Sequence, residues 1–331
     1  MMTIKNILAS ASVALLLTGI TSCDKRDNNI NFPAGVTDNI STIADNNNLK
    51  VFAAAVKAAE MDTAFSYLGQ YTVFAPSDSA FNANGINTGN IGTIPPATLR
   101  AILRNHILSG RTTSGSLLPG PNAAYRPINV EYLFTSTYIP STGIFQGVFF
   151  NGKRLEKADI VANNGVIHVI KGILLPAANS LTDLLGANAN LSLLQAAITR
   201  AGLTATLQGL NAPVTILAPT NAAFNAAGFA DVAAVNAADP VVLGNILRNH
   251  VIVNGATTNS LRRLFLPDFR AITYTGLAGT VACTMSGNAP RFRGPSSTAD
   301  AAIVVPDLQY RSAITAGAPN VVHVIDRVLL P

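Results

Sequence analysis

The second half of this 331-residue chain repeats the first, and that repeat limits the possible folds more than any other feature. Three blocks recur in the same order: TVFAPSDSAF at 72–81 and TILAPTNAAF at 215–224, LRNHI at 103–107 and LRNHV at 247–251, and VIHVI at 166–170 and VVHVI at 321–325. The offsets are 143, 144 and 155 residues, so the second copy has a net insertion of 155 − 144 = 11 residues before its last block. Blocks repeated in order predict two modules of one fold.

Each block also predicts a local structure. The β-branched and aromatic runs at 71–74 and 214–217 predict buried strands. Each run leads through Ala-Pro to Ser77 or Thr220, which we expect to be the N-cap of a short helix. The third block is a continuous β-branched run with a central histidine, which is typical of a strand buried on both faces. Asn151-Gly152 predicts the turn of a β-hairpin.

Helices are predicted by apolar residues spaced i, i+3, i+4 and i+7. Two such helices start at Pro96 and Pro240, where proline suits the first turn. This spacing places His106 and His250 on the apolar faces. The asparagines that precede two other amphipathic segments are candidate N-caps: Asn47, Asn48, and Asn188 to Asn190.

These motifs, each matched twice, resemble the fasciclin domain over nearly all of residues 40–331. The resemblance implies an α+β fold of two tandem modules, each a wedge of two β-sheets with several helices packed on one side. We expect the first module at 40–176 and the second at 180–331. The linker between them is only Ala177-Ala178-Asn179, so we expect the modules to touch.

Residues 1–22 have the form of an export signal. Lys5 precedes an apolar stretch of about 14 residues, which is too short to span a bilayer as a helix and is typical of a secretory signal. The following Ile20-Thr21-Ser22-Cys23 resembles the lipobox of bacterial lipoproteins, which implies cleavage before Cys23 and its acylation. Residues 23–39 would then form a flexible polar tether. An ordinary signal peptide with an incidental cysteine is the alternative.

Composition excludes some classes of protein. Only 12% of the residues are charged, against roughly 25% in an ordinary soluble protein. The formal net charge of +5 is too small to indicate a nucleic-acid-binding protein. Cys23 and Cys283 are the only cysteines, so acylation of Cys23 would leave no intramolecular disulfide. We expect Cys283, in an alternating run, to be a small buried side chain.

The sequence contains no pattern typical of catalysis or metal binding. All four histidines lie in the repeated blocks, and we expect them to be hydrogen-bonded core residues: His106, His168, His250 and His323. Histidine, cysteine and carboxylate residues show no metal-ligand spacing, and G-x-S-x-G is absent. The sequence therefore predicts no enzyme activity, no metal and no cofactor.

The fasciclin resemblance implies adhesion and extracellular ligand binding. The family often has Tyr-His where this chain has Asn105-His106 and Asn249-His250, so both pairs are candidate contacts without the family's tyrosine. A second family contact is an acidic residue followed by an aliphatic one before the final strand. Asp159-Ile160 matches it, and Asp307-Leu308 is the best match in the second copy. Alternatively, these aspartates only cap a turn ahead of the strand.

The second module contains no lysine or glutamate from Ser180 onward, but it has an arginine-rich part. Its candidate ligand contacts are Arg262, Arg263, Arg291 and Arg293. Guanidinium groups form paired hydrogen bonds with carboxylates and phosphates, so an acidic glycan or a lipid head group is a conceivable partner. The alternative is that the arginines of this part pair with nearby acids: Asp268, Asp300 and Asp307.

The sequence thus predicts a lipid-anchored protein of the outer membrane or cell surface. Its modules would bind an extracellular protein or a glycan and no nucleic acid. Two alternatives share this location. The chain could be an accessory subunit of an outer-membrane uptake or assembly complex, or an enzyme that acts on a polysaccharide.

Overall fold

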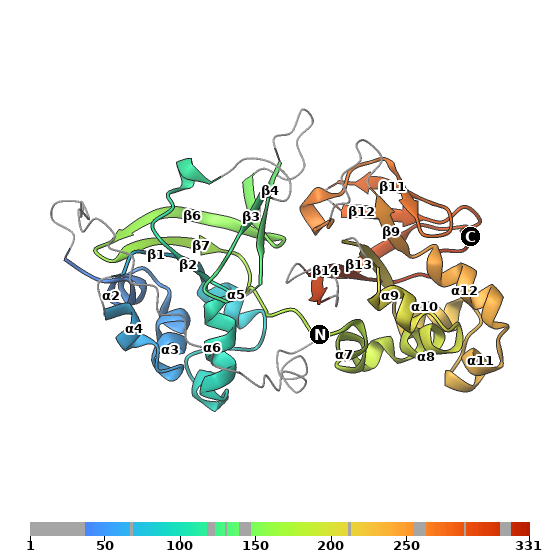
Figure 1. Ribbon diagram of the computed structural model, residues 1–331, viewed down its shortest axis with the longest axis horizontal. Coiled ribbons are helices and arrows are strands. Elements are labelled where there is room, and N and C mark those ends of the chain that lie inside the picture. Colours follow the sequence, from blue (N-terminus) through green and yellow to red (C-terminus); the bar gives the residue numbers. More distant parts are fainter. Residues whose placement is uncertain are drawn as a thin grey trace.

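A computed structural model of the chain describes residues 37–66, 69–117, 123–129, 131–138, 147–210, 213–254, 263–287, 289–311 and 319–331. The expected signal at 1–22, Cys23, most of the expected tether and Arg262 lie outside these residues. Figure 1 shows two modules side by side, each with its strands packed on helices. In the part of the chain that is described, no helix is long and apolar enough to cross a membrane.

The first module runs from α2 to β7. Its helices are α2 (Ile40–Asn46), α3 (Lys50–Ala58), α4 (Asp62–Ser66), α5 (Asp78–Asn82) and α6 (Pro96–Arg104), with the short 3-10 helices η1 (Ile91–Thr93) and η2 (Ser114–Ser116). Its strands are β1 (Tyr71–Pro76), β2 (Ile107–Ser109), β3 (Ala123–Tyr125), β4 (Leu133–Tyr138), β5 (Gly147–Phe150), β6 (Lys153–Ala162) and β7 (Gly165–Ile170). They form a seven-stranded sheet in the order β2-β1-β7-β6-β5-β4-β3.

The second module runs from α7 to β14. Its helices are α7 (Leu181–Gly186), α8 (Ser192–Arg200), α9 (Thr204–Gln208), α10 (Asn221–Ala226), α11 (Val232–Ala237) and α12 (Pro240–Arg248), with the 3-10 helices η3 (Ala189–Leu191) and η4 (Leu266–Asp268). Its strands are β8 (Thr215–Pro219), β9 (Val251–Asn254), β10 (Thr273–Gly276), β11 (Thr280–Ser286), β12 (Ala289–Arg293), β13 (Ala301–Tyr310) and β14 (Asn320–Ile325).

The strand order confirms the duplication. Starting from β9, the second module reads β9-β8-β14-β13-β12-β11-β10, which is the order of the first module with each strand replaced by its counterpart. Pairing of β9 with β10 closes the second sheet into a barrel. In both modules the central pair is parallel, β1 with β7 and β8 with β14. Every residue of β7 and β14 is buried, as the sequence predicts.

The long strand β6 joins the two halves of the first sheet. Its start pairs with β5, through Phe150 and Lys153, and the stretch from Leu155 to Ala162 pairs with β7. Register shifts lie between these positions, and β-bulges of this kind bend a strand. The α+β class is confirmed, and the two sheets of the expected wedge share one strand.

The expected starts of four helices are confirmed. The side chains of Ser77 and Thr220 accept backbone N–H bonds at the starts of α5 and α10, and proline lies in the first turn of α6 and α12. The predicted turn of a hairpin is also present, since Asn151-Gly152 joins β5 to β6 with φ angles of 43° and 79°.

Of the asparagine caps predicted before α3 and α8, Asn188 caps η3, the 3-10 turn that leads into α8, by accepting the N–H of Asn190 at 3.1 Å. The helices α3 and α8 themselves begin without an asparagine cap. The residue before each helix is a leucine without a capping side chain. Asp78, at the start of α5, instead accepts the N–H of Val51 at 2.9 Å, and Asn221 accepts the N–H of Leu193 at 3.0 Å. A side chain about 28 residues away therefore caps each helix and ties α3 to α5 and α8 to α10.

Candidate functional site

His106 and His250 have the same structural role in the two modules. In each ring, Nδ1 donates to a carbonyl oxygen 2.9 Å away in the preceding helix, that of Ile102 or Ile246. Nε2 accepts a backbone N–H from the final segment of its module. The donor is Leu174 in the first module, at 2.9 Å, and the equivalent leucine in the second module, at 2.8 Å. Burial lowers the pKa of both histidines to about 4. These neutral rings are the hydrogen-bonded core residues that the sequence predicts.

The candidate contacts Asn105 and Asn249 are also buried. Each ends its helix, and its amide donates to the carbonyl of Leu174 or Leu329, at 3.5 and 3.3 Å. Asn105 also accepts a hydrogen bond from Asn129 at 2.6 Å. These asparagines and the adjacent histidines lie inside the modules, so the structure gives them the role of joining the end of a helix to the final segment of the module.

Asp159 and Asp307 mark a β-bulge in β6 and in β13. Both have left-handed backbones, with φ angles of 58° and 59°. The backbone N–H of each aspartate lies 3.3 Å from Nδ1 of a buried histidine, His168 in one module and His323 in the other. This shared geometry makes Asp307-Leu308 the structural counterpart of Asp159-Ile160.

The two aspartate carboxylates also do similar work. Asp159 accepts the backbone N–H of Ser114 at 2.8 Å and also its hydroxyl, and so anchors η2. Asp307 accepts the N–H of Leu266, the first residue of η4, at 2.7 Å. Each aspartate thus holds the start of a 3-10 helix that lies more than 40 residues earlier in the chain, rather than a turn directly ahead of its own final strand. Their surroundings differ, because Asp159 is exposed and Asp307 is buried.

The hairpin between β5 and β6 covers Asp307. Lys153 places its ammonium nitrogen 3.6 Å from a carboxylate oxygen of Asp307, and Asn151 donates to the side chain of Gln309 at 3.3 Å. Gly152 lies so close to Asp307 that a β-carbon at this position would overlap the carboxylate. The tip of a first-module hairpin therefore packs directly on β13 of the second module.

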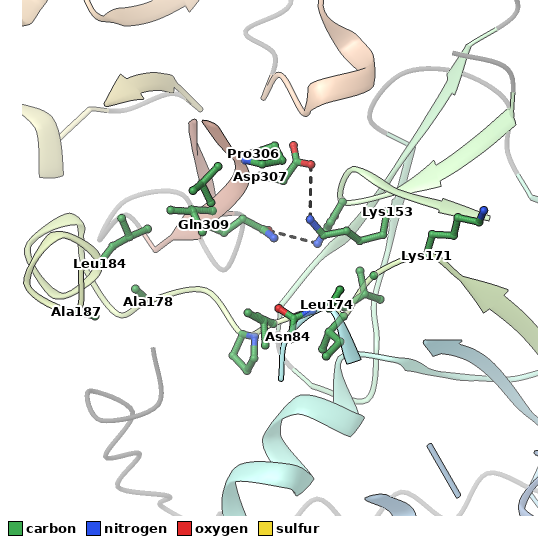
Figure 2. Close-up of a pocket in the computed structure, with 18 of the residues that line it drawn as sticks. Asn84, Lys153, Lys171, Leu174, Ala178, Leu184, Ala187, Pro306, Asp307 and Gln309 are labelled. Atoms are coloured by element: carbon green, nitrogen blue, oxygen red, sulfur yellow. Dashed lines mark hydrogen bonds and ion pairs between the residues drawn. The ribbon is translucent and has the colours of Figure 1, made fainter. Parts of the chain in front are cut away.

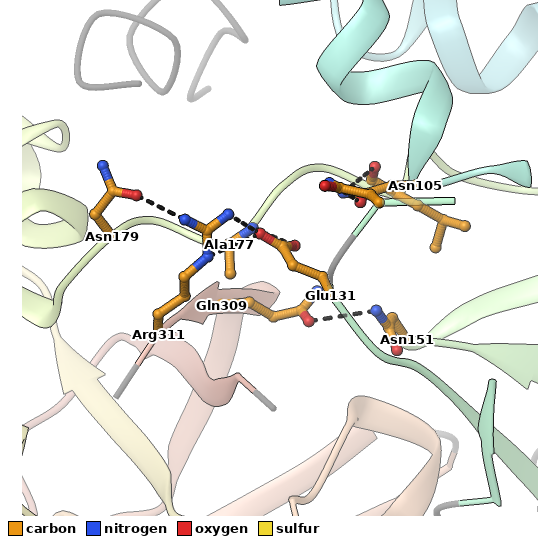
Figure 3. A network of polar contacts seen from close by, with 9 residues as sticks. Asn105, Glu131, Asn151, Ala177, Asn179, Gln309 and Arg311 are labelled. Carbon is orange, nitrogen blue, oxygen red and sulfur yellow. Dashed lines mark hydrogen bonds and ion pairs between the residues drawn. The ribbon is translucent and has the colours of Figure 1, made fainter. Parts of the chain in front are cut away.

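A second polar contact fixes the linker between the modules (Figure 3). The buried carboxylate of Glu131, in the first module, accepts the N–H of Ala177 at 3.0 Å and the Nε of Arg311 at 3.0 Å, and it also pairs with the Nη2 of Arg311. Arg311 reaches Asn179 at 2.9 Å as well. The linker is thus bound to both modules, and the expectation that they touch is confirmed.

The third contact between the modules is aromatic. The ring centroids of Phe134 in β4 and Phe265 in the second module lie 6.4 Å apart, and the guanidinium of Arg263 lies 4.4 Å above the Phe134 ring. Arg263 also donates to the carbonyl of Pro319. Only 8% of Arg263 is exposed, so the structure places this candidate ligand contact inside the junction between the modules.

A cavity of about 430 Å³ lies between the modules (Figure 2). Its first-module wall is the hairpin, the end of α5 and the segment that follows β7, and its second-module wall is formed by α7 and β13. Lys153, Asp307 and Gln309 line it. Side chains from both copies of the repeat therefore line a single cavity.

Arg291 and Arg293 lie on the opposite side of the barrel sheet from the buried Phe292. Arg293 pairs with Asp300 at 2.5 Å, as the alternative interpretation of the arginines predicts. The partner of Asp307, however, is Lys153 and not an arginine.

Cys283 is buried in β11, as expected, and burial raises the pKa of its thiol to about 12. A thiol with such a pKa is a poor nucleophile at neutral pH. Across the described ranges, no group of three or more His, Cys, Asp or Glu side chains is arranged to hold a metal ion.

Comparison with known proteins gives consistent matches. The fasciclin domain family model matches residues 47–176 and again 189–331. The pig transforming growth factor-beta-induced protein ig-h3 is 32% identical over 192 residues, which are 57% of this chain and 27% of that protein. Protein sll1483 of Synechocystis is 35% identical over 146 residues, 42% of this chain and 76% of that protein. The chain thus spans under a third of the ig-h3 relatives.

Among solved structures, a FAS1 domain pair of the insect cell adhesion molecule fasciclin I covers 87% of this chain and 98% of that one, with 17% identity and a TM-score of 0.40. The family assignment does not depend on that likeness, because the family model alone matches most of the chain, in two separate copies. The chain therefore belongs to the fasciclin domain family and contains two tandem fasciclin domains.

Proposed function

We propose that this protein is a cell-surface adhesion protein, held in the outer membrane by a lipid on Cys23, whose fasciclin domains bind an extracellular glycan. Family membership supports a binding role rather than an enzymatic one. The lipobox-like Ile20-Thr21-Ser22-Cys23 supports the anchor. The low charge of the chain fits modules that carry no membrane-binding patch of their own.

The surface that favours a glycan is the outer face of β10, β11 and β12. Alternation along these strands leaves a row of exposed hydroxyl side chains on this face: Thr273, Thr275, Thr280, Thr284 and Ser286. Arg291 and Arg293 lie on the same face, and the register pairs Arg291 with Thr284. Hydroxyl groups can hydrogen-bond to sugar hydroxyls, and guanidinium groups to their carboxylates or sulfates. This combination of side chains is the single observation that favours an acidic glycan over a protein ligand.

The glycan role can be tested with immobilised polysaccharides. The full-length chain carrying Cys23→Ser is passed over a uronate-containing polysaccharide and over a neutral glucan. We expect selective binding to the acidic polysaccharide, and loss of most of that binding in the double variant Arg291→Gln/Arg293→Gln. Lys57→Gln/Arg104→Gln removes the same charge from exposed helix positions of the first module and should bind normally. Equal losses of binding in both double variants would show that the net charge of the protein, and not this surface, determines the binding.

The anchor needs a separate experiment. Cys23→Ser should move the protein from the membrane fraction to the soluble fraction, and the unchanged protein should be digested by protease added to intact cells. Persistence of the variant in membranes would overturn the lipid anchor. Protection of the unchanged protein from protease would place the modules on the inner side of the outer membrane, which would favour an accessory role in an envelope complex.

A further inference from the structure

The cavity between the modules has the size and lining of a small-molecule site. Its volume of about 430 Å³ falls in the range of roughly 300–1,000 Å³ that is usual for such sites. Most of its lining is apolar, contributed by Leu174, Leu175 and Pro176 from the first module and by Leu184, Val305 and Leu308 from the second. An apolar molecule that entered it would therefore be removed from water on several sides.

Lys153 interrupts this apolar lining with a positive charge. Figure 2 shows Lys153 extending from the first module toward Asp307 and Gln309. The Asp307 side chain is only 2% exposed, whereas that of Lys153 remains 23% exposed. Within the described residues, the 3.6 Å ion pair with Asp307 is the polar contact of this ammonium group, and Asp307 also accepts the N–H of Leu266. The buried carboxylate thus holds in place a lysine side chain that lines the cavity and is still partly exposed.

This arrangement restricts the chemistry of an occupant. A purely apolar molecule would remove water from Lys153 without replacing its hydrogen bonds, which is costly for a charged group. A molecule with one anionic group near Lys153 would satisfy the ammonium group and still bury its apolar part. A second anion at the other end would meet the carboxylate of Asp183, which lines the cavity from α7. Lys171 also lines the cavity, but its side chain is 52% exposed, against 23% for Lys153, so an anion beside Lys171 would be less shielded from water.

We propose that the inter-module cavity binds a small amphiphile with a single carboxylate. The carboxylate pairs with Lys153, and the apolar chain lies between the segment that follows β7 and helix α7. Because both walls are needed, the ligand binds only when the two modules are docked. This site is separate from the outer face of β10 to β12 and does not depend on the glycan-binding role.

The probe for this site is decanoate, titrated calorimetrically into the full-length Cys23→Ser chain, with decanol as its uncharged equivalent. We expect decanoate to bind more tightly than decanol. Lys153→Gln should weaken decanoate by about tenfold, the usual effect of losing one charge-assisted hydrogen bond, and should leave decanol nearly unchanged. Lys153→Arg should restore most of the decanoate affinity. Lys57→Gln, which removes an exposed lysine elsewhere, should have no effect.

A second pair of variants tests the location. Ala187 ends α7 and lines the cavity, so Ala187→Phe should fill it and abolish binding of both probes. Ala227 ends α10 outside the cavity, and Ala227→Phe is the matched control that should bind normally. The proposal is overturned if decanoate does not bind, if decanol binds as tightly as decanoate, or if Ala187→Phe binds as the unchanged protein does. Thermal unfolding of each variant shows whether it is folded.

Discussion

Asp307 occupies in the second module the position that Asp159 occupies in the first, yet only Asp307 is covered by the other module. Both residues form a β-bulge and both cap a 3-10 helix. The difference is the hairpin tip at Gly152, which packs on Asp307, whereas Asp159 is exposed. A position that was equivalent after duplication has thus become a junction residue in one copy only.

Removing these two carboxylates should therefore have unequal effects. Asp307→Ala leaves the N–H of Leu266 and the ammonium group of Lys153 without their partner in a buried setting, so we expect a loss of about 1–3 kcal/mol in the free energy of unfolding. Asp159→Ala exposes its partner Ser114 to water and should lose less. Urea denaturation of both variants measures the difference. Equal losses of unfolding free energy would show that burial at the junction does not increase the contribution of Asp307 to stability.

The close approach of Gly152 to Asp307 predicts a specific way to separate the modules. Gly152→Ala adds a methyl group that overlaps the Asp307 carboxylate, so we expect the interface to open and the radius of gyration in X-ray solution scattering to increase. Gly85→Ala is a matched control, because Gly85 has a similar φ of 73° against 79° but no atom within 4 Å of an added β-carbon. An equal radius for both variants would show that the hairpin tip can move without opening the junction.

The remote caps of α3 and α8 predict a small and symmetrical effect. Asp78→Ala and Asn221→Ala each remove the acceptor for an N–H at the start of a helix, and we expect each to cost about 1 kcal/mol of unfolding free energy. Asp78→Asn should retain most of that stability, because the second module uses an asparagine at the same position. Chemical denaturation of the three variants checks this, and a loss in Asp78→Asn as large as in Asp78→Ala would show that the charge, rather than the hydrogen bond, is needed.

The buried histidines predict that the protein loses stability in acid. Burial lowers the pKa of His106 in the folded chain to about 4, below the value of 6.5 for an exposed histidine. The stabilising contribution of the neutral ring is therefore complete above pH 6.5 and is lost as the pH falls toward 4, because the unfolded chain takes up the proton first. The size is up to roughly 3 kcal/mol for each such histidine. His250 should behave in the same way.

This pH dependence is measured as a difference between variants, because one carboxyl group acts in the opposite direction. Burial raises the pKa of Asp268 to about 7, so its protonation favours the folded chain as the pH falls. His106→Gln should be less stable than the unchanged protein at pH 7.5. Its unfolding free energy should then fall less between pH 7.5 and pH 4.5, and a fall of the same size in both proteins would contradict the histidine explanation.

Much of the fold could be predicted because it depends on local and repeated signals. Ser77 and Thr220 act as caps through bonds three residues away, and the buried strands at 165–170 and 320–325 are continuous β-branched runs. The equivalence of Asp307 and Asp159 in the two modules could be predicted from the repeat, although the second copy has an insertion. The helix caps of α3 and α8 were not predictable, because the acceptors come from a later helix.

The candidate site was predicted less well, since the sequence does not show how two modules dock. Lys153 meets Asp307, and Glu131 meets Arg311, only because the two modules dock. Arg263 lies in an arginine-rich part of the sequence and was expected to contact a ligand, but its guanidinium lies over the Phe134 ring at the junction. One weak signal was present in the sequence: lysine and glutamate are confined to the part of the chain before Ser180.

The absence of lysine and glutamate from the second module has a consequence for repeated contacts between modules. The junction joins two unlike faces, and a contact of that type can in principle continue from copy to copy into a filament. The first module contributes Lys153 and Glu131, and the second module contains no residue of either type. The second module therefore lacks the lysine and the glutamate through which the first module makes this junction, so a further copy could not repeat the contact with the same side chains.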